Sequence, residues 1–198
     1  MDMRATGLYF VAAVGLLGSP GPGIAALLAV GKSHGWVRSL RYYAGLQIGL
    51  GIALALSGAG LVSIMTAYPQ ITSAMTILAT VYLLYLAYAI ATSPTGMDAT
   101  GKPRSPSATS GMLLGISNPK AYLAFASLLT SPFNLVADDA GNVGAKMILT
   151  MLVIIAVDIV WLWIGVLIGR AHLAKRAERA LNISMGSMIV AAAALMFV

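Results

Sequence analysis

Six stretches of mainly apolar residues, each long enough to cross a lipid bilayer as a helix, dominate this chain of 198 residues. A transmembrane helix needs about 20 such residues, because the hydrocarbon layer is roughly 30 Å thick and each residue advances the helix by about 1.5 Å. Charged residues are only 9% of the chain, against about 25% in soluble domains, too few to cover a water-facing surface. We therefore predict an all-α integral membrane protein in contact with the lipid bilayer. The expected spans are 7–30, 42–65, 71–91, 111–130, 145–169 and 181–198.

The first stretch has some features of a secretory signal peptide, because Arg4 precedes an apolar run that contains small residues. The run continues to Val30, however, whereas the apolar region of a signal peptide is about 7–15 residues long. We therefore interpret it as a retained helix.

Basic residues gather in three alternating loops, 31–41, 92–110 and 170–180, which hold nine of the twelve lysines and arginines. The opposite side holds Arg4 and Lys146. By the positive-inside rule the side with nine bases faces the cytoplasm, so both termini of this multi-pass protein are expected outside. The net charge of +6 does not indicate nucleic-acid binding, because the bases are not interleaved with aromatic residues on a polar face.

Residues 93–110 are rich in Pro, Gly, Ser and Thr, which predicts a flexible cytoplasmic linker. The linker divides the chain into a first three-helix repeat, 1–92, and a second, 111–198. Because each half has an odd number of spans, the second half inserts upside down relative to the first. This predicts a 3+3 inverted repeat, an architecture common among transporters.

Proline and glycine interrupt the first and fourth spans at matching positions, in "GSPGPGI" (18–24) and "GISNPKA" (115–121). Pro22 and Pro119 lie 97 residues apart, and each follows a glycine by four positions. Proline removes a backbone N–H donor and clashes with the carbonyl one turn earlier, so the freed polar groups must be buried in protein or line a wet cavity. Functional breaks would offer helix N-termini and carbonyls to a small dipolar substrate such as an amino acid. The alternative is that the glycines only admit a neighbouring helix.

Two ionisable residues, Lys120 and Asp158, fall deep inside predicted spans, where a charge costs about 2.5–3.5 kcal/mol on insertion scales. They form either a structural ion pair or a functional site, in which Asp158 binds an ammonium group or exchanges a proton and Lys120 attracts a carboxylate. Gln47 and Asn118 add uncharged polar groups, although Asn118 alternatively caps the helix that restarts at Pro119. The candidate substrate-binding residues are Pro20, Gly21, Pro22, Gly23, Gln47, Asn118, Pro119, Lys120 and Asp158.

Composition argues against several other functions. The chain has no cysteine, and both histidines, His34 and His172, fall in basic loops, so neither a disulfide nor a zinc site is indicated. No nucleophile–base pair occurs within the spans, and we expect no enzyme activity, no cofactor and no bound metal. Small-residue faces such as the one with Gly45 and Gly49 permit a homodimer without requiring one.

Several segments, taken in order along nearly the whole chain, resemble the LysE/RhtB family of amino-acid exporters. They are "SPGPG", "AGLQIGLGIAL", "YLLYLAY", "SNPKAYLAF", "VDIVWLWIG" and "ALNISMGSM". "GLQIGL" and "VDI" particularly resemble the homoserine/threonine-exporter branch. The resemblance implies six helices in a 3+3 inverted repeat in the bacterial cytoplasmic (inner) membrane, with efflux of an amino acid or derivative by proton or ion antiport. The family's marks fall on Pro20, Gly21, Pro22, Gln47, Asn118, Pro119, Lys120 and Asp158.

The chain departs from the family pattern where a substrate would be read. Gly23 and Ile24 stand where many members have a polar residue, and the segments "AYLAFASLL" and 131–144 also differ. Two alternatives to amino-acid export therefore stay open: export of a cation or other solute, and a non-transporting membrane scaffold for envelope assembly. A single intramembrane carboxylate makes a poor cation cage, which argues against the first alternative.

Overall fold

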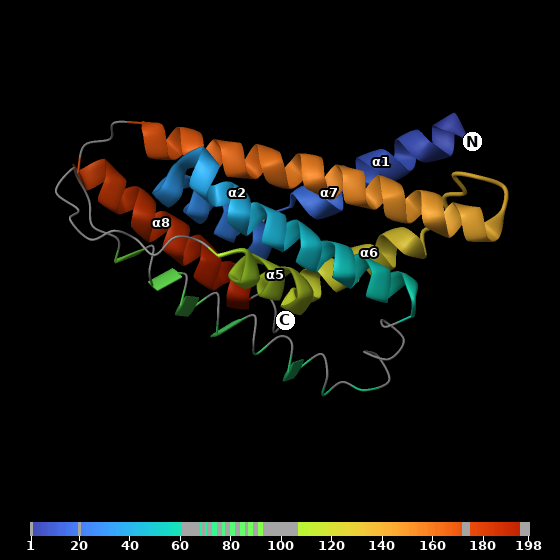
Figure 1. Ribbon diagram of the computed structural model, residues 1–198, viewed down its shortest axis with the longest axis horizontal. Helices are drawn as coiled ribbons and strands as arrows, with labels where there is room; N and C mark the ends of the chain where they lie inside the picture. Colours follow the sequence, from blue (N-terminus) through green and yellow to red (C-terminus); the bar gives the residue numbers. More distant parts are fainter. Residues whose placement is uncertain are drawn as a thin grey trace.

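A computed structural model of the chain describes residues 2–19, 21–60, 107–171 and 175–194, with scattered positions between 68 and 92. The described residues form helices and no strand (Figure 1), which confirms the all-α prediction for this part of the chain. Of the predicted linker 93–110, residues 93–106 lie outside the described residues. The helices are α1 (Met3–Gly18), α2 (Pro22–Gly58), α5 (Ala108–Ser117), α6 (Pro119–Leu129), α7 (Asp139–Arg170) and α8 (Lys175–Ala194).

Helix α2 passes through most of the loop predicted at 31–41, so that prediction is wrong in extent. Only Gly35 leaves helical geometry, with φ 70° and ψ 179°, and it divides α2 into two segments. A positive φ of this size is strained for residues with a Cβ, which makes glycine the suitable residue at this turn. The Ser39 hydroxyl braces the turn by donating to the carbonyl of Gly35 at 2.6 Å, and it also lies 3.0 Å from the carbonyl of Val30.

Helix α7 begins at Asp139, six residues before the predicted start of the fifth span. The reason is a local cap, because the Asp138 carboxylate accepts a hydrogen bond of 2.6 Å from the N–H of Gly141. By length and composition, α7 is the one described helix that could cross a bilayer by itself, and α1 with α2 passes the same test as a bent pair. Helices α5 and α6, with 10 and 11 residues, are each too short to cross about 30 Å alone.

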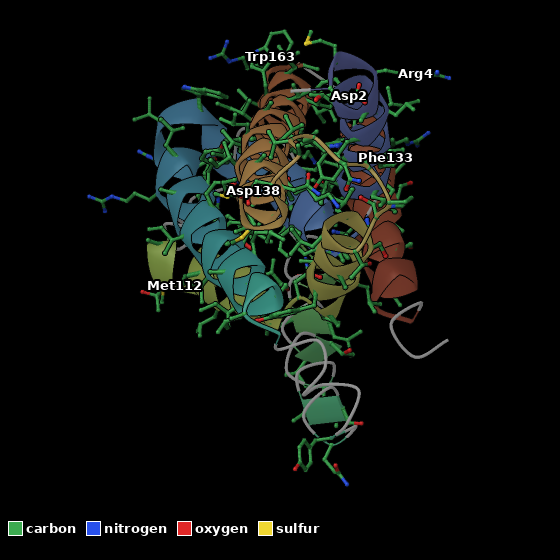
Figure 2. The ribbon with its side chains drawn as sticks, turned by 90° about the vertical axis from the view of Figure 1, so that its right-hand side faces the viewer. Asp2, Arg4, Met112, Phe133, Asp138 and Trp163 are labelled. Atoms are coloured by element: carbon green, nitrogen blue, oxygen red, sulfur yellow. The ribbon has the colours of Figure 1, made fainter. Side chains whose placement is uncertain are left out.

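The two faces of α7 differ sharply. Thr150, Ile154, Asp158, Leu162 and Val166 follow one another at steps of four, and all five are buried. An exposed apolar row runs along the opposite side, and Figure 2 shows one of its members, Trp163, pointing away from the other helices. The exposed row also includes Ile148, Leu152, Val160 and Leu167. Such a continuous apolar surface suits contact with lipid.

Glycines let α2 approach two neighbours closely, one with each of its segments. In the first segment, a Cβ on Gly31 would lie 2.6 Å from the carbonyl oxygen of Leu162 in α7. In the second, a Cβ on Gly45 or Gly49 would overlap the backbone of α5. The face with Gly45 and Gly49 is therefore covered by α5 within the chain, so these two glycines do not offer a surface to a second copy, and the possible homodimer stays a prediction.

One end of the bundle is held by a polar cluster around Lys146, here called the Lys146 cluster and made of Tyr9, Leu129, Ser131, Lys146 and Thr150. The Lys146 ammonium donates to the carbonyls of Leu129 and Ser131 at 3.1 and 2.7 Å. The Tyr9 hydroxyl lies 2.6 Å from the Thr150 hydroxyl and 3.2 Å from the Lys146 carbonyl. Lys146 was expected as an outer topology charge, but it is buried inside α7.

Figure 2 views the molecule from this end, with Asp2, Phe133 and Asp138 near the viewer, and shows α7 between α1 and α2. Phe133, in the α6–α7 connection, meets the Tyr9 ring edge to face at a centroid distance of 6.5 Å. The α1 N-terminus is tied to the same connection by the Asp2 N–H, which donates to the Leu135 carbonyl at 3.0 Å. The end of α2 also lies here, because a Cβ on Gly58 would lie 3.0 Å from the sulfur of Met147. We call this the Lys146 end of the bundle.

Candidate functional site

The helical path is interrupted between α1 and α2, where the first motif lies. Helix α1 ends at Gly18, Ser19 and Gly21 are extended, and α2 begins at Pro22. The axes of the two helices are inclined by 65°. Proline suits the first position of a helix, because its φ is already helical and its missing N–H would have had no partner there. Pro20, a predicted site residue, lies outside the described residues.

The second motif separates α5 from α6 in a similar way. Helix α5 ends at Ser117, Asn118 is extended with φ −82° and ψ 99°, and α6 begins at Pro119. Asn118 occupies the N-cap position, but its side chain makes no capping hydrogen bond, so the capping alternative is wrong. Its side-chain oxygen is buried without a hydrogen-bond partner among the described residues. A buried carbonyl oxygen in that state is costly unless something else supplies a donor.

Lys120 connects the two motifs. Its ammonium group, on the first turn of α6, donates a hydrogen bond to the carbonyl of Ser19 at the end of α1. The chain of Lys120 passes over Gly21, since a Cβ on that glycine would lie 2.7 Å from Cδ and 2.9 Å from Nζ of the lysine. Glycine at this position therefore leaves the space that the lysine side chain uses.

Asp158 lies on the buried face of α7, with 3% of its surface exposed. It accepts a hydrogen bond of 2.8 Å from the Gln47 side-chain nitrogen on the second segment of α2. The other amide atom of Gln47, its oxygen, is buried without a partner among the described residues. Asp158 also lies close enough to Lys120 for their charges to attract each other. An acid and a base from different helices thus share one location inside the bundle.

These groups line a partly open cavity of about 40 Å³, whose wall is formed by residues of α1, α2, α6 and α7 and of the connections between them. Of the predicted residues, Gly21, Pro22, Gly23, Asn118, Lys120 and Asp158 line it. Gln47 is brought to the site through its hydrogen bond to Asp158, whereas Pro119 is buried at the start of α6 and does not line the cavity. The two motifs, 97 residues apart in sequence, therefore contribute to the same cavity.

The cavity also contains residues that the sequence analysis did not single out. Ser19 supplies the carbonyl that Lys120 binds, while Leu50, Ala124 and Ile154 are apolar parts of the wall. Helical spacing offered a signal for the last three. Each lies three or four residues from Gln47, Lys120 or Asp158, and residues at that spacing share a helix face.

A sequence model of the LysE type translocator family matches residues 14–198, which is nearly the whole chain and includes both motifs and Asp158. The chain belongs to the LysE type translocator family. This result confirms the resemblance found in the sequence. LysE type translocators are membrane transport proteins, which agrees with the lipid-facing surface of α7.

Three relatives of this chain are efflux proteins by name. A leucine efflux protein from Klebsiella pneumoniae is 30% identical over 74% of this chain and 71% of its own length. Cysteine/O-acetylserine efflux proteins from Salmonella choleraesuis and Salmonella typhimurium are 28% identical over 90% of both chains. No solved structure matches significantly. The finer resemblance to homoserine/threonine exporters stays a prediction, because these LysE relatives carry other substrates in their names.

Proposed function

We propose that this protein is a secondary transporter that exports a small amino acid or related zwitterion across the bacterial cytoplasmic membrane. The observation that carries the proposal is the cavity, since it places a cationic and an anionic side chain beside two helix beginnings. An amino acid likewise carries one positive and one negative group a few ångströms apart. The efflux proteins related to this chain support an amino acid as the transported class.

The substrate carboxylate binds at the Lys120 side of the cavity in this proposal. Helices α2 and α6 both begin there, and Gly23 and Ile24 of α2 and Lys120 of α6 line the wall from their first turns. Several N–H groups in a first helical turn lack partners within the helix, and the helix dipole makes that end attractive to anions. Lys120 adds a full positive charge at the same place.

The substrate ammonium group binds between Asp158 and Asn118. Asp158 contributes the negative charge, and the side-chain oxygen of Asn118 contributes an acceptor that has no partner among the described residues. An ammonium group has three N–H donors, and pairing them with these acceptors would remove the cost of the buried, unpaired oxygen. Gln47 holds the Asp158 carboxylate in position through the 2.8 Å hydrogen bond.

Export is coupled to a proton or another ion through Asp158, whose carboxylate is exposed to the cavity but otherwise buried. Binding of the substrate ammonium and binding of a proton would then compete for the same group. Residues 1–92 and 111–198 act as two inverted three-helix repeats joined by the linker 93–110, with both termini outside. Rocking of one repeat against the other would expose the cavity to each side in turn.

Reconstituted transport tests the proposal directly. Liposomes that contain the purified protein are loaded with labelled leucine, cysteine, O-acetylserine or threonine. Efflux is then measured with and without an imposed proton gradient. We expect protein-dependent efflux of at least one of these amino acids. The proton gradient should accelerate this efflux, and a protonophore should return it to the rate measured without a gradient. Efflux equal to that of protein-free liposomes for every amino acid would contradict amino-acid export. Efflux that is unchanged by the imposed proton gradient would contradict coupling to protons.

A variant pair separates transport from the scaffold alternative in cells. Lys120→Ala and Asp158→Ala should abolish the export phenotype, while the membrane level of each protein stays normal. A scaffold would keep its phenotype in both variants, because it needs the packing surfaces and not the charges in the cavity.

A further inference from the structure

The cavity wall has apolar residues about one helical turn away from its polar groups, and this pattern is clearest on α6 and α7. On α6, Ala124 lies four residues after Lys120, and on α7, Ile154 lies four residues before Asp158. The apolar residue in each pair lines the cavity about one helical turn, roughly 5.4 Å, from its polar partner. On α2, the lining residue Leu50 follows Gln47, the hydrogen-bond partner of Asp158, by three residues. On α1, Leu16 precedes Ser19, the residue just after the helix, by three.

In all four pairs, the apolar residue lies on the same side of its polar partner, toward one end of the molecule. The second segment of α2 and α6 run toward the Lys146 end, since Gly58 and Leu129 meet Met147 or Lys146 there. Helices α1 and α7 start at that end (Figure 1). On α2 and α6, which run toward the Lys146 end, the apolar residue follows the polar one. On α1 and α7, which run away from that end, the apolar residue precedes the polar one. All four apolar residues therefore lie on the same side. These four residues, here called the apolar layer, face the Lys146 end.

We propose that the apolar layer binds the side chain of the exported amino acid and selects an aliphatic one, with Ala124 setting the largest size accepted. This proposal rests on the proposed export of amino acids. With the carboxylate at Lys120 and the ammonium at Asp158, the remaining substituent of the α-carbon extends one turn toward Leu50 and Ile154. A polar side chain there would lose its hydrogen bonds to water and meet only hydrocarbon.

The small size of Ala124 is the reason to expect that this residue limits the size of the substrate side chain. It is buried, and it lies on the same face of α6 as Lys120, whereas its counterparts on the other helices are leucine or isoleucine. A larger residue at 124 would occupy space next to the α-carbon of the substrate. Discrimination by one methylene in an apolar pocket amounts to about 10-fold to 200-fold, so such a change is measurable.

The test uses the full-length protein in liposomes and compares efflux of alanine, valine, threonine and leucine, each measured as kcat/KM. Valine and threonine have nearly the same shape, so their ratio isolates the effect of polarity. We expect wild-type protein to prefer valine to threonine by about 10-fold to 100-fold. Ala124→Leu should lower leucine efflux at least 10-fold relative to alanine efflux. Ala156→Leu, at an exposed position on α7, is the matched control and should leave both ratios unchanged.

The opposite change provides an independent reading if Ala124→Leu does not reach the membrane. Ile154→Ala enlarges the same layer and should raise leucine efflux relative to alanine efflux by severalfold. Equal efflux of valine and threonine by wild-type protein would overturn the aliphatic layer. If the ratio of leucine efflux to alanine efflux is unchanged in the variant that folds, Ala124→Leu or Ile154→Ala, this layer does not select substrates by size. Either result leaves amino-acid export standing, whereas failure of the proposed function would appear as no efflux of any amino acid.

Discussion

Lys120 and Lys146 are two inward-facing lysines with similar bonds and different surroundings. Each donates to backbone carbonyls at the end of a helix, Lys120 to Ser19 after α1 and Lys146 to Leu129 and Ser131 at the end of α6. Positive charge is favoured at this end of a helix, because the carbonyls there lack partners and the dipole is negative. Hydrogen bonding alone therefore does not distinguish the two residues.

The difference lies in what else each lysine meets. Lys120 lines the cavity and is attracted by the negative charge of Asp158. Lys146 does not line the cavity and lies in a cluster that joins α1, α6 and α7. We infer that Lys120 serves transport and Lys146 serves stability. The comparison teaches that a charge inside a membrane protein marks function only when it faces a space that a substrate can enter.

The largest loss of efflux is expected from a substitution of Asp158, the acid beside Lys120. Asp158→Asn keeps the size of the side chain but removes its charge, so neither a proton nor an ammonium group is held as before. We expect gradient-driven efflux to fall about 100-fold, in line with the roughly 1.5–3 kcal/mol of a hydrogen bond to a charged group. Asp138→Asn is the control, because asparagine caps a helix nearly as well as aspartate and this acid lies at the start of α7. Wild-type efflux from Asp158→Asn would remove its proposed role.

The two lysines can be compared directly by the same substitution. Lys120→Met should reduce efflux at least 10-fold, and it should also lower the free energy of unfolding, because it leaves the Ser19 carbonyl without its donor and the buried Asp158 without a positive charge beside it. Lys146→Met should keep efflux near the wild-type rate but lower the free energy of unfolding by about 1–3 kcal/mol, since it leaves two partly buried carbonyls without their donor. Thermal unfolding in detergent and efflux from liposomes measure the two effects. A reversed pattern would show that the two lysines were assigned the wrong way round.

The contact between Gly21 and Lys120 predicts a smaller effect. Gly21→Ala places a Cβ 2.7 Å from Cδ of Lys120, and the flexible lysine chain must move aside. We expect efflux to fall about fivefold, because the displaced lysine no longer holds its place in the cavity, and the free energy of unfolding to fall by about 1 kcal/mol from overpacking. Gly15→Ala is the matched change on α1, where a Cβ would meet nothing within 4 Å. Equal efflux from both alanine variants would mean that the lysine position does not matter.

The smallest effect is expected in the Lys146 cluster. Tyr9→Phe removes the hydroxyl that lies 2.6 Å from Thr150 and 3.2 Å from the Lys146 carbonyl, but it keeps the ring against Phe133. The free energy of unfolding should fall by about 1 kcal/mol, and efflux should stay within twofold of wild type. A large loss of efflux at unchanged stability would indicate that this cluster takes part in transport.

Much of the candidate site was accessible from the order of residues alone. Proline at the start of a helix follows from its fixed φ and missing N–H, which is why α2 and α6 begin at Pro22 and Pro119. Lys120 and Asp158 were identifiable because a charge inside an apolar stretch is costly in lipid. The loop at 31–41 could not be predicted correctly, because its polar residues are compatible with a helix and only Gly35 departs from one.

Other features depended on which helices meet. The face with Gly45 and Gly49 was open to a dimer in the sequence, but α5 covers it in the fold. Lys146 counted as a topology charge until its carbonyl partners showed that it is a buried link between helices. Ala124 and Ile154 carried no signal as single residues, and their role became visible only because the fold brings both to the wall of one cavity.

The sequence by itself determined that this chain is helical and apolar and that it belongs to the LysE type translocators, because composition, periodicity and motifs act along the chain. Only the tertiary structure decided that Lys120 reaches across Gly21 to Ser19 and that Gln47 holds Asp158. Those pairs are about 100 residues apart in sequence, and a contact over such a distance depends on how the helices pack, which local residue preferences do not encode.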